Sequence, residues 1–125
     1  MDGADSAPSA GFPAKRAATP AIVPAPGDEM TKPAQLSDEA IDAFVAAHRG
    51  WERAGGALAR TFAFDTYAAG IAFVVRVVFA AEARDHHPDL VVGWRKVKVA
   101  WATHDAGGIT ALDTEMAERS DGLAG

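Results

Sequence analysis

The sequence contains no cysteine, which excludes disulfide bonds, thiolate metal ligands and a cysteine nucleophile. It has no apolar run long enough to span a membrane, and the stretch AIVPAP is too short and too broken by proline to form a secretory signal. Positive charge is scarce: the sequence has 12 Lys and Arg residues against 17 Asp and Glu residues, which gives a formal net charge of -5. Direct binding to nucleic acid needs a basic surface that neutralises phosphates, so it is not expected here.

Several catalytic motifs are absent as well. The sequence has no GxSxG nucleophile elbow, no HExxH zinc motif and no Gly-rich phosphate loop with a lysine. The GGIT segment lacks the lysine and the spacing of an anion loop, and we interpret it as a turn. What the chain does have is 125 residues, of which 49% are hydrophobic and 23% charged, a composition typical of one small globular domain.

The first 34 residues differ from the remainder in composition. They are rich in Ala, Pro and Gly, contain few large apolar residues and show no hydrophobic period. We therefore predict a flexible N-terminal extension over residues 1–34 and a folded domain over residues 35–125. A targeting leader is the alternative for the extension, and its acidic residues and scarcity of arginine disfavour that alternative.

The predicted domain begins with a helix in LSDEAIDAFVAAHRGW. Ser37 is placed to cap this helix, Ile41, Phe44 and Val45 fall on one face, and Gly50 supplies a stop. The next segment, WERAGGALARTFAF, has two short stretches of strand character around a Gly-Gly pair, which predicts a β-hairpin.

The segment DTYAAGIAFVVRVVFAAEARDHH predicts the longest helix. Asp65 is the expected N-cap. A buried apolar stripe is expected at helical spacing, formed by Ile71, Val74, Val75, Val78 and Phe79. The same spacing leads to Glu82, for which a solvated position in the last turn is the alternative to a role at the end of the stripe. Pro88 disfavours helical geometry at His87, so the helix should end near the His pair.

Two further strands are predicted in LVVGW and KVKVAWATH, with Val97, Val99 and Trp101 on one face of the second and His104 on the other. Thr110 and Asp113 have the spacing of a capping box at the start of a final helix. The element order α-β-β-α-β-β-α indicates an α+β fold, a single small domain whose four-stranded antiparallel sheet carries three helices on one face. The other face would stay open to a ligand or a second subunit.

Three of the four histidines, His86, His87 and His104, lie at the ends of predicted elements, where their side chains can converge on a cleft. Three imidazoles can ligate zinc, but adjacent residues make poor simultaneous ligands and no other zinc spacing is present. A structural role for the histidines is a second alternative. Imidazoles give and take protons near neutral pH, so such a group suits the elimination of water by general acid and base catalysis.

Seven residues follow one another in an order and spacing that resemble the signature of the pterin-4a-carbinolamine dehydratase family: Glu82, His86, His87, Pro88, Trp94, His104 and Asp113. The segments HRGW, RTFAFDTY and THDAGGITALDTEMA also resemble segments common in that family. The resemblance covers residues 36–121, which is nearly the whole predicted domain.

This resemblance implies an enzyme that removes water from 4a-hydroxytetrahydrobiopterin or a related pterin to give quinonoid dihydropterin, and so recycles the cofactor of aromatic amino acid hydroxylases. It implies no metal and no organic cofactor, a homodimer or homotetramer, and a cytoplasmic location. It also implies that His86 and His104 act as acid and base, and that His87 binds the pterin and takes part in proton transfer.

Four further residues are candidates for the pocket or its support. By the resemblance, Glu82 would orient an imidazole. Asp113 either belongs to the site or only caps the last helix. Trp94 and Trp51 can wall a flat heterocycle, although core packing explains either of them. Two other functions stay open: a non-catalytic binding, assembly or coactivator protein of the same family, and a metal-dependent hydrolase that uses the three histidines.

Overall fold

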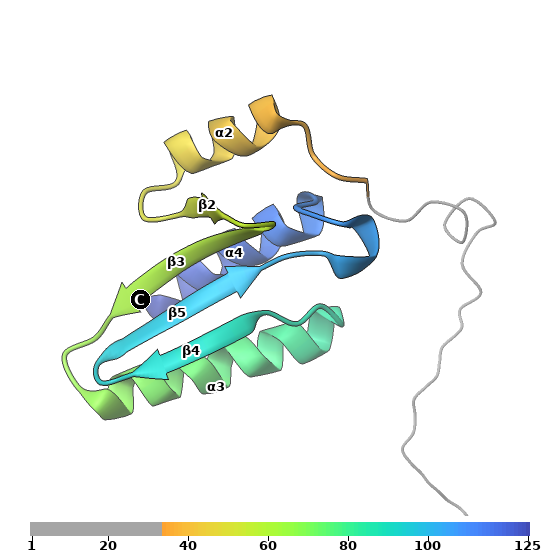
Figure 1. The fold of residues 1–125 in the computed structure, drawn as a ribbon. Helices are drawn as coiled ribbons and strands as arrows, with labels where there is room; N and C mark the ends of the chain where they lie inside the picture. Colours follow the sequence, from red (N-terminus) through yellow and green to blue (C-terminus); the bar gives the residue numbers. More distant parts are fainter. Residues whose placement is uncertain (1–33) are drawn as a thin grey trace, which may run out of the picture. The chain divides into compact units, whose positions relative to one another are not determined.

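The computed structural model describes residues 34–125, so the predicted extension lies outside this range except for Ala34. The elements follow in the order α2 (Asp38–Ala47), β2 (Glu52–Ala54), β3 (Ala57–Ala63), α3 (Tyr67–Arg84), β4 (Asp89–Gly93), β5 (Lys96–Trp101), the 3-10 turn η1 (His104–Ala106) and α4 (Ala111–Ala124) (Figure 1). The four strands form one antiparallel sheet in the order β2-β3-β5-β4. The predicted α+β fold and its element order are confirmed.

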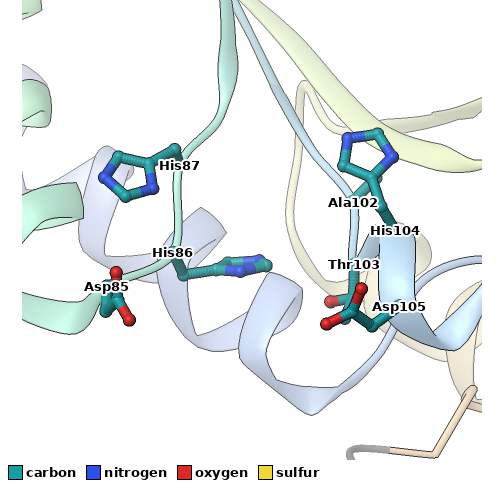
Figure 2. A pocket seen from close by; sticks show the side chains of 7 residues that line it. All are labelled: Asp85, His86, His87, Ala102, Thr103, His104 and Asp105. Carbon is teal, nitrogen blue, oxygen red and sulfur yellow. The ribbon is translucent and has the colours of Figure 1, made fainter.

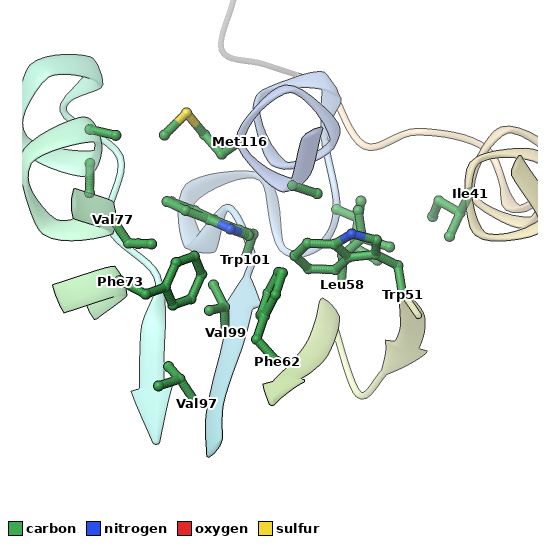
Figure 3. Close-up of a cluster of buried hydrophobic side chains, with 14 residues drawn as sticks. Ile41, Trp51, Leu58, Phe62, Phe73, Val77, Val97, Val99, Trp101 and Met116 are labelled. Carbon is green, nitrogen blue, oxygen red and sulfur yellow. The ribbon is translucent and has the colours of Figure 1, made fainter. Parts of the chain in front are cut away.

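The core lies between the sheet and the helices (Figure 3). The predicted alternation along β5 is confirmed, because Val97, Val99 and Trp101 are all fully buried. Trp101 also has its polar atom satisfied: its Nε1–H donates to Ser120 Oγ at 3.0 Å, and the Ser120 hydroxyl donates to the carbonyl of Met116 at 2.7 Å. These hydrogen bonds fix α4 over the end of β5 without leaving a buried donor unpaired.

The buried face of α3 differs from the predicted one. The helix buries Gly70, Phe73, Val77, Ala80 and Ala81. In the predicted stripe, Ile71 and Val74 are only half-buried, and Val75, Val78 and Phe79 are 47%, 43% and 71% exposed. The prediction of a buried stripe was therefore wrong for the last three residues.

The reason is that α3 is apolar on more than one face, so helical periodicity alone does not select the face that meets the sheet. The buried face is selected instead by how closely the helix backbone can approach the sheet. A Cβ added at Gly70 would lie 3.5 Å from Val97 Cγ2 and 3.4 Å from the Phe64 ring. Gly70 lets the helix backbone approach the sheet at this point, while Val75, Val78 and Phe79 remain outside.

Side-chain caps fix where the helices begin. Ser37 Oγ accepts a hydrogen bond from Ala40 N–H at 3.1 Å, which confirms the predicted cap of α2. The cap predicted for α3 was wrong by one residue: Thr66, not Asp65, accepts from Ala69 N–H at 3.0 Å. An N-cap side chain bonds an amide two or three residues later, and for a helix that begins at Tyr67 only residue 66 has that register.

An ion pair between α3 and α4 provides a test of pH-dependent stability. Arg84 Nε–H donates to Glu115 Oε2 at 2.8 Å, and this hydrogen bond lowers the pKa of Glu115. Both side chains are about half exposed, so the pair contributes at most about 1 kcal/mol. Because the folded-state pKa is depressed, the contribution is present above the ordinary glutamate value of about 4.3 and is lost as pH falls through the folded value.

We expect the Glu115→Gln variant to lose part of the acid-induced fall in stability. The measurement is the free energy of unfolding, from urea denaturation, at several pH values between about 7 and about 3. The variant should be less stable than the parent protein near neutral pH and nearly equal to it at the acid end. Two curves separated by the same amount at every pH would contradict the assignment.

None of the helices in residues 34–125 combines the length and the apolar content needed to cross a membrane.

Candidate active site

A left-handed turn at the end of α3 directs the chain into the site. Asp85 has φ 54° and ψ 44°, and its backbone N–H donates to the carbonyls of Ala81 and Glu82. Aspartate is one of the few residues other than glycine that adopts this backbone conformation readily. The chain leaves the helix there, and Pro88 disfavours a return to helical geometry at His87. The predicted helix end near the His pair is confirmed.

His104 lies on a short loop beyond β5. The strand ends at Trp101, so His104 is not a strand residue as predicted but the first residue of η1. Thr103 N–H donates to Gly108 O at 3.1 Å and Gly108 N–H donates to Thr103 O at 3.3 Å, which closes the loop. Gln35 Nε2–H also donates to Ala106 O at 2.7 Å. These hydrogen bonds hold the segment that carries His104 in place.

The three predicted histidines line one open pocket of about 240 Å³. Figure 2 shows His86 and His87 on one wall and His104 on the other, with the rings of His86 and His87 pointing in opposite directions. The remaining lining residues are Asp85, Ala102, Thr103 and Asp105. The fold thus brings together side chains from the end of α3 and from the loop after β5.

His86 is held by a buried carboxylate. Its Nε2 lies 2.6 Å from Asp113 Oδ1, and the side chains are 11% and 0% exposed. The His86 ring also stacks against Trp101, with ring centroids 5.7 Å apart and an angle of 18° between the planes. Two contacts therefore fix the ring, and Nδ1 remains as the nitrogen that can exchange a proton with a ligand.

Asp113 both caps α4 and contacts His86. The predicted capping box is confirmed, because Asp113 Oδ2 accepts from the Thr110 backbone N–H at 2.9 Å. The same oxygen accepts from Thr103 Oγ1 at 2.8 Å, while Oδ1 faces His86. A fully buried carboxylate is costly unless it is paired and hydrogen-bonded, and these three donors meet that need. The cap of α4 and the orientation of His86 depend on one carboxyl group.

The other predicted acidic residue contacts the other histidine of the pair. Glu82 Oε2 lies 2.7 Å from His87 Nε2. These side chains are 70% and 54% exposed, so water screens the contact and its contribution to ring orientation is small. His87 is consequently held less firmly than His86.

Neither predicted tryptophan lines the pocket. Trp94 lies at the turn between β4 and β5, at the opposite end of β5 from His104, and is 72% exposed. Trp51 is only 3% exposed, and its Nε1–H donates to both carboxylate oxygens of Asp121 at 3.0 and 3.1 Å. The core role that explained Trp51 in the sequence is the one observed.

Sequence reasoning missed Thr103. Its side chain is 7% exposed, lines the pocket and donates to Asp113, so it joins the His104 loop to the carboxylate that holds His86. A signal was present, because Thr103 continues the inward-facing alternation of Val97, Val99 and Trp101. A hydroxyl at the next inward position must find a buried partner.

Within residues 34–125, no group of three or more His, Cys, Asp or Glu side chains is arranged to hold a metal ion. The histidine rings instead stand on two sides of a pocket, and His86 and His87 each contact a carboxylate. The arrangement can exchange protons with a bound molecule from two directions.

Comparisons with known proteins identify the family of this chain. The model of the family "Pterin 4 alpha carbinolamine dehydratase" matches residues 34–123. A relative from Mycolicibacterium vanbaalenii, provisionally named a pterin-4-alpha-carbinolamine dehydratase, is 49% identical over 92 residues, which cover 74% of this chain and 99% of the relative. A similarly named relative from Natronomonas pharaonis is 44% identical over 90 residues, covering 72% and 96% of the two chains.

Two solved structures are also similar. A transcriptional coactivator/pterin dehydratase from Brucella melitensis superposes with a TM-score of 0.70 at 30% identity, over 73% of this chain and 99% of the other. A pterin dehydratase-like protein described as a RuBisCO assembly factor in the alpha-carboxysome gives 0.52 at 27% identity, over 62% and 93%. With the family model spanning most of the chain and relatives of nearly 50% identity, the chain belongs to the pterin-4a-carbinolamine dehydratase family.

Proposed function

We propose that this protein removes water from a 4a-hydroxytetrahydropterin, with 4a-hydroxytetrahydrobiopterin as the leading candidate, to give the quinonoid dihydropterin. One observation carries the proposal: His86 and His104 line the same pocket from two segments, and a buried carboxylate fixes one of them. Membership of the family supports the substrate class. The expected cytoplasmic location is part of the same proposal.

The reaction needs one proton donor and one proton acceptor. The C4a–O bond breaks as the departing hydroxyl takes a proton and leaves as water. The N5–H proton goes to a base, and the N5 electron pair forms the new C4a–N5 double bond. Atoms and charge balance without an oxidant, a reductant or a covalent intermediate, so two positioned imidazoles are sufficient.

His86 is the better placed base. Asp113 fixes its ring and stabilises the positive charge that the ring gains when it takes a proton, as a buried carboxylate does for the histidine of a catalytic triad. His104 is exposed, and no hydrogen bond from its side chain to another residue of 34–125 is found, so it is free to donate its proton to the hydroxyl. His87, on the same wall as His86, would bind the pterin.

The rate enhancement that the reaction needs is within reach of this mechanism. A carbinolamine of this type loses water unaided, so the protein has only to accelerate a feasible reaction. General acid and base catalysis contributes about 10²- to 10⁴-fold, and holding the substrate in orientation adds to that.

The direct test follows the absorbance of 4a-hydroxytetrahydropterin as it dehydrates, with and without the purified full-length protein, before and after treatment with a chelator. Acceleration that survives chelation is the expected result. Acceleration lost on chelation and restored by a divalent metal would replace this mechanism with a metal-dependent one. No acceleration at all would favour a binding or assembly role, such as the one described for the carboxysome protein.

A second copy of this chain is the partner that we propose for the outer face of α3. Val75, Val78 and Phe79 form an exposed apolar group there, and Tyr67 on the same helix is 53% exposed. Monomeric proteins rarely expose large contiguous apolar patches, so burial in an oligomer of dimer or tetramer size is the expected state.

Replacing Phe79 with glutamate should shift the protein toward smaller species, because charges would face one another across the helix contact. Light scattering coupled to size-exclusion chromatography measures the mass of each species. Ala46→Glu on α2 is a matched control, since Ala46 is exposed and lies on another helix. Equal masses for the Phe79 variant and the parent protein, or a monomeric parent, would contradict a contact through α3.

A further inference from the structure

A second cavity adjoins the histidine pocket. It measures about 370 Å³ and shares Ala102, Thr103 and His104 with the first, which measures about 240 Å³. Pockets that bury a small organic ligand usually measure about 300–1,000 Å³. The histidine pocket alone falls below that range, and the two cavities together fall within it. A ligand that reacts beside His104 therefore has room for a substituent on the other side of that residue.

The second cavity is lined mainly by small residues and differs in this from the histidine pocket. Gly56, Ala57, Gly107 and Gly108 contribute no bulk to its wall, and a Cβ added at Gly56 would meet no atom within 4 Å. The one charged carboxylate in the lining belongs to Asp89, the first residue of β4. Among residues 34–125 no hydrogen bond or ion pair to this exposed carboxylate is found. An ionised carboxylate offers two acceptor oxygens and no donor, so it suits hydroxyl groups.

We propose that the second cavity holds the hydroxylated substituent at C6 of the pterin and that Asp89 accepts hydrogen bonds from its hydroxyl groups. This inference rests on the proposed dehydration. C6 is bonded to N5, the nitrogen that loses a proton in the reaction. The first atom of a C6 substituent lies two bonds from N5, and N5 is also bonded to C4a, whose hydroxyl takes a proton from His104 in the proposed reaction. His104 lines both cavities. Asp89 and the open space beside Gly56 would determine which pterins the enzyme prefers.

Selectivity between two substrates tests the proposal. One substrate is 4a-hydroxytetrahydrobiopterin, which carries a dihydroxypropyl group at C6, and the other is its 6-methyl analogue, which carries no hydroxyl there. The parent protein should have the higher kcat/KM for the first. Asp89→Ala should reduce that preference by about 10-fold or more, because a hydrogen bond to a charged group is lost. Asp42→Ala is the control, since Asp42 is an exposed aspartate on α2.

The Gly56→Leu variant tests whether the substrate needs the room in the second cavity. A Cβ at Gly56 meets no atom within 4 Å, so a leucine there is expected to take up space in the second cavity, which Gly56 lines, while Gly56 does not line the histidine pocket. The preference for the dihydroxypropyl substrate should again fall by about 10-fold, mainly through KM. Gly122→Leu on α4 is the control, because a Cβ there also meets no atom within 4 Å. Thermal melting of each variant verifies that it folds.

The outcomes separate the two proposals. A fall in preference with both Asp89→Ala and Gly56→Leu supports the C6 subsite. Unchanged preference in both, or equal losses for the two substrates, overturns it while the dehydratase assignment stands. A parent protein that accelerates neither substrate removes the proposed function and the subsite together.

Discussion

Replacing His104 with alanine is expected to lower kcat for dehydration by about 10²- to 10⁴-fold, the range of a lost general acid or base. His104 is exposed, begins the η1 turn and lines the pocket. Its removal should leave the fold intact, since its side chain is not part of the core. The measurement is the dehydration rate at saturating substrate, together with a thermal melt that shows an unchanged transition.

The fourth histidine is the matched control for this experiment. His48 stacks on Phe44 at 3.8 Å between ring centroids and contacts Glu118, and it lines neither cavity. His48→Ala should keep the parent rate. The assignment of His104 fails if its alanine variant retains the parent kcat, or if the His48 variant loses as much activity.

Replacing Asp113 with alanine should damage stability and activity together. The change removes the acceptor for His86, for the Thr103 hydroxyl and for the Thr110 backbone N–H, all in a region where Asp113 is fully buried. Each buried donor left without its acceptor costs about 1–3 kcal/mol. Urea denaturation should show a loss of that size, with Asp42→Ala as the exposed control.

The Asp113→Asn variant separates orientation of His86 from capping. Asparagine has nearly the same volume and keeps one oxygen that can accept from Thr103 and Thr110, but it presents an amide in place of a carboxylate to His86. We expect most of the stability to return while kcat stays about 10- to 100-fold below the parent value with little change in KM. The pH dependence of kcat should also change. A variant with the parent kcat and pH profile would restrict Asp113 to its role as a cap.

The sequence predicted the features that depend on residues close together in the chain. The alternation of Val97, Val99 and Trp101 identified the buried face of β5, and the spacing of Thr110 and Asp113 identified a capping box. A cap or a strand face is set by contacts over a few residues, so its pattern is visible locally. The cap of α3 was missed by one residue because Asp65 and Thr66 are both suitable residue types and stand side by side.

The face that α3 buries was decided by packing against the sheet. The helix offers apolar residues on more than one face, and Gly70 allows its backbone to lie close to Val97 of the sheet. The size of a neighbouring side chain on another element enters that choice, and helical periodicity holds no information about it. Val75, Val78 and Phe79, which were predicted to be buried, are exposed and lie on the surface proposed to contact a second copy.

By itself the sequence determined the α+β element order, the core face of β5 and the signature that contains the three histidines, because each is recorded in residue types and short spacings. Only the tertiary structure decided that Asp113 holds His86 across 27 residues of chain, that Thr103 joins the two walls, and that Trp94 lies away from the pocket. The contacts of Asp113 with His86 and Thr103 join residues 27 and 10 positions apart in the sequence. Their partners are chosen by how α4 packs over the end of the sheet, which no local pattern specifies.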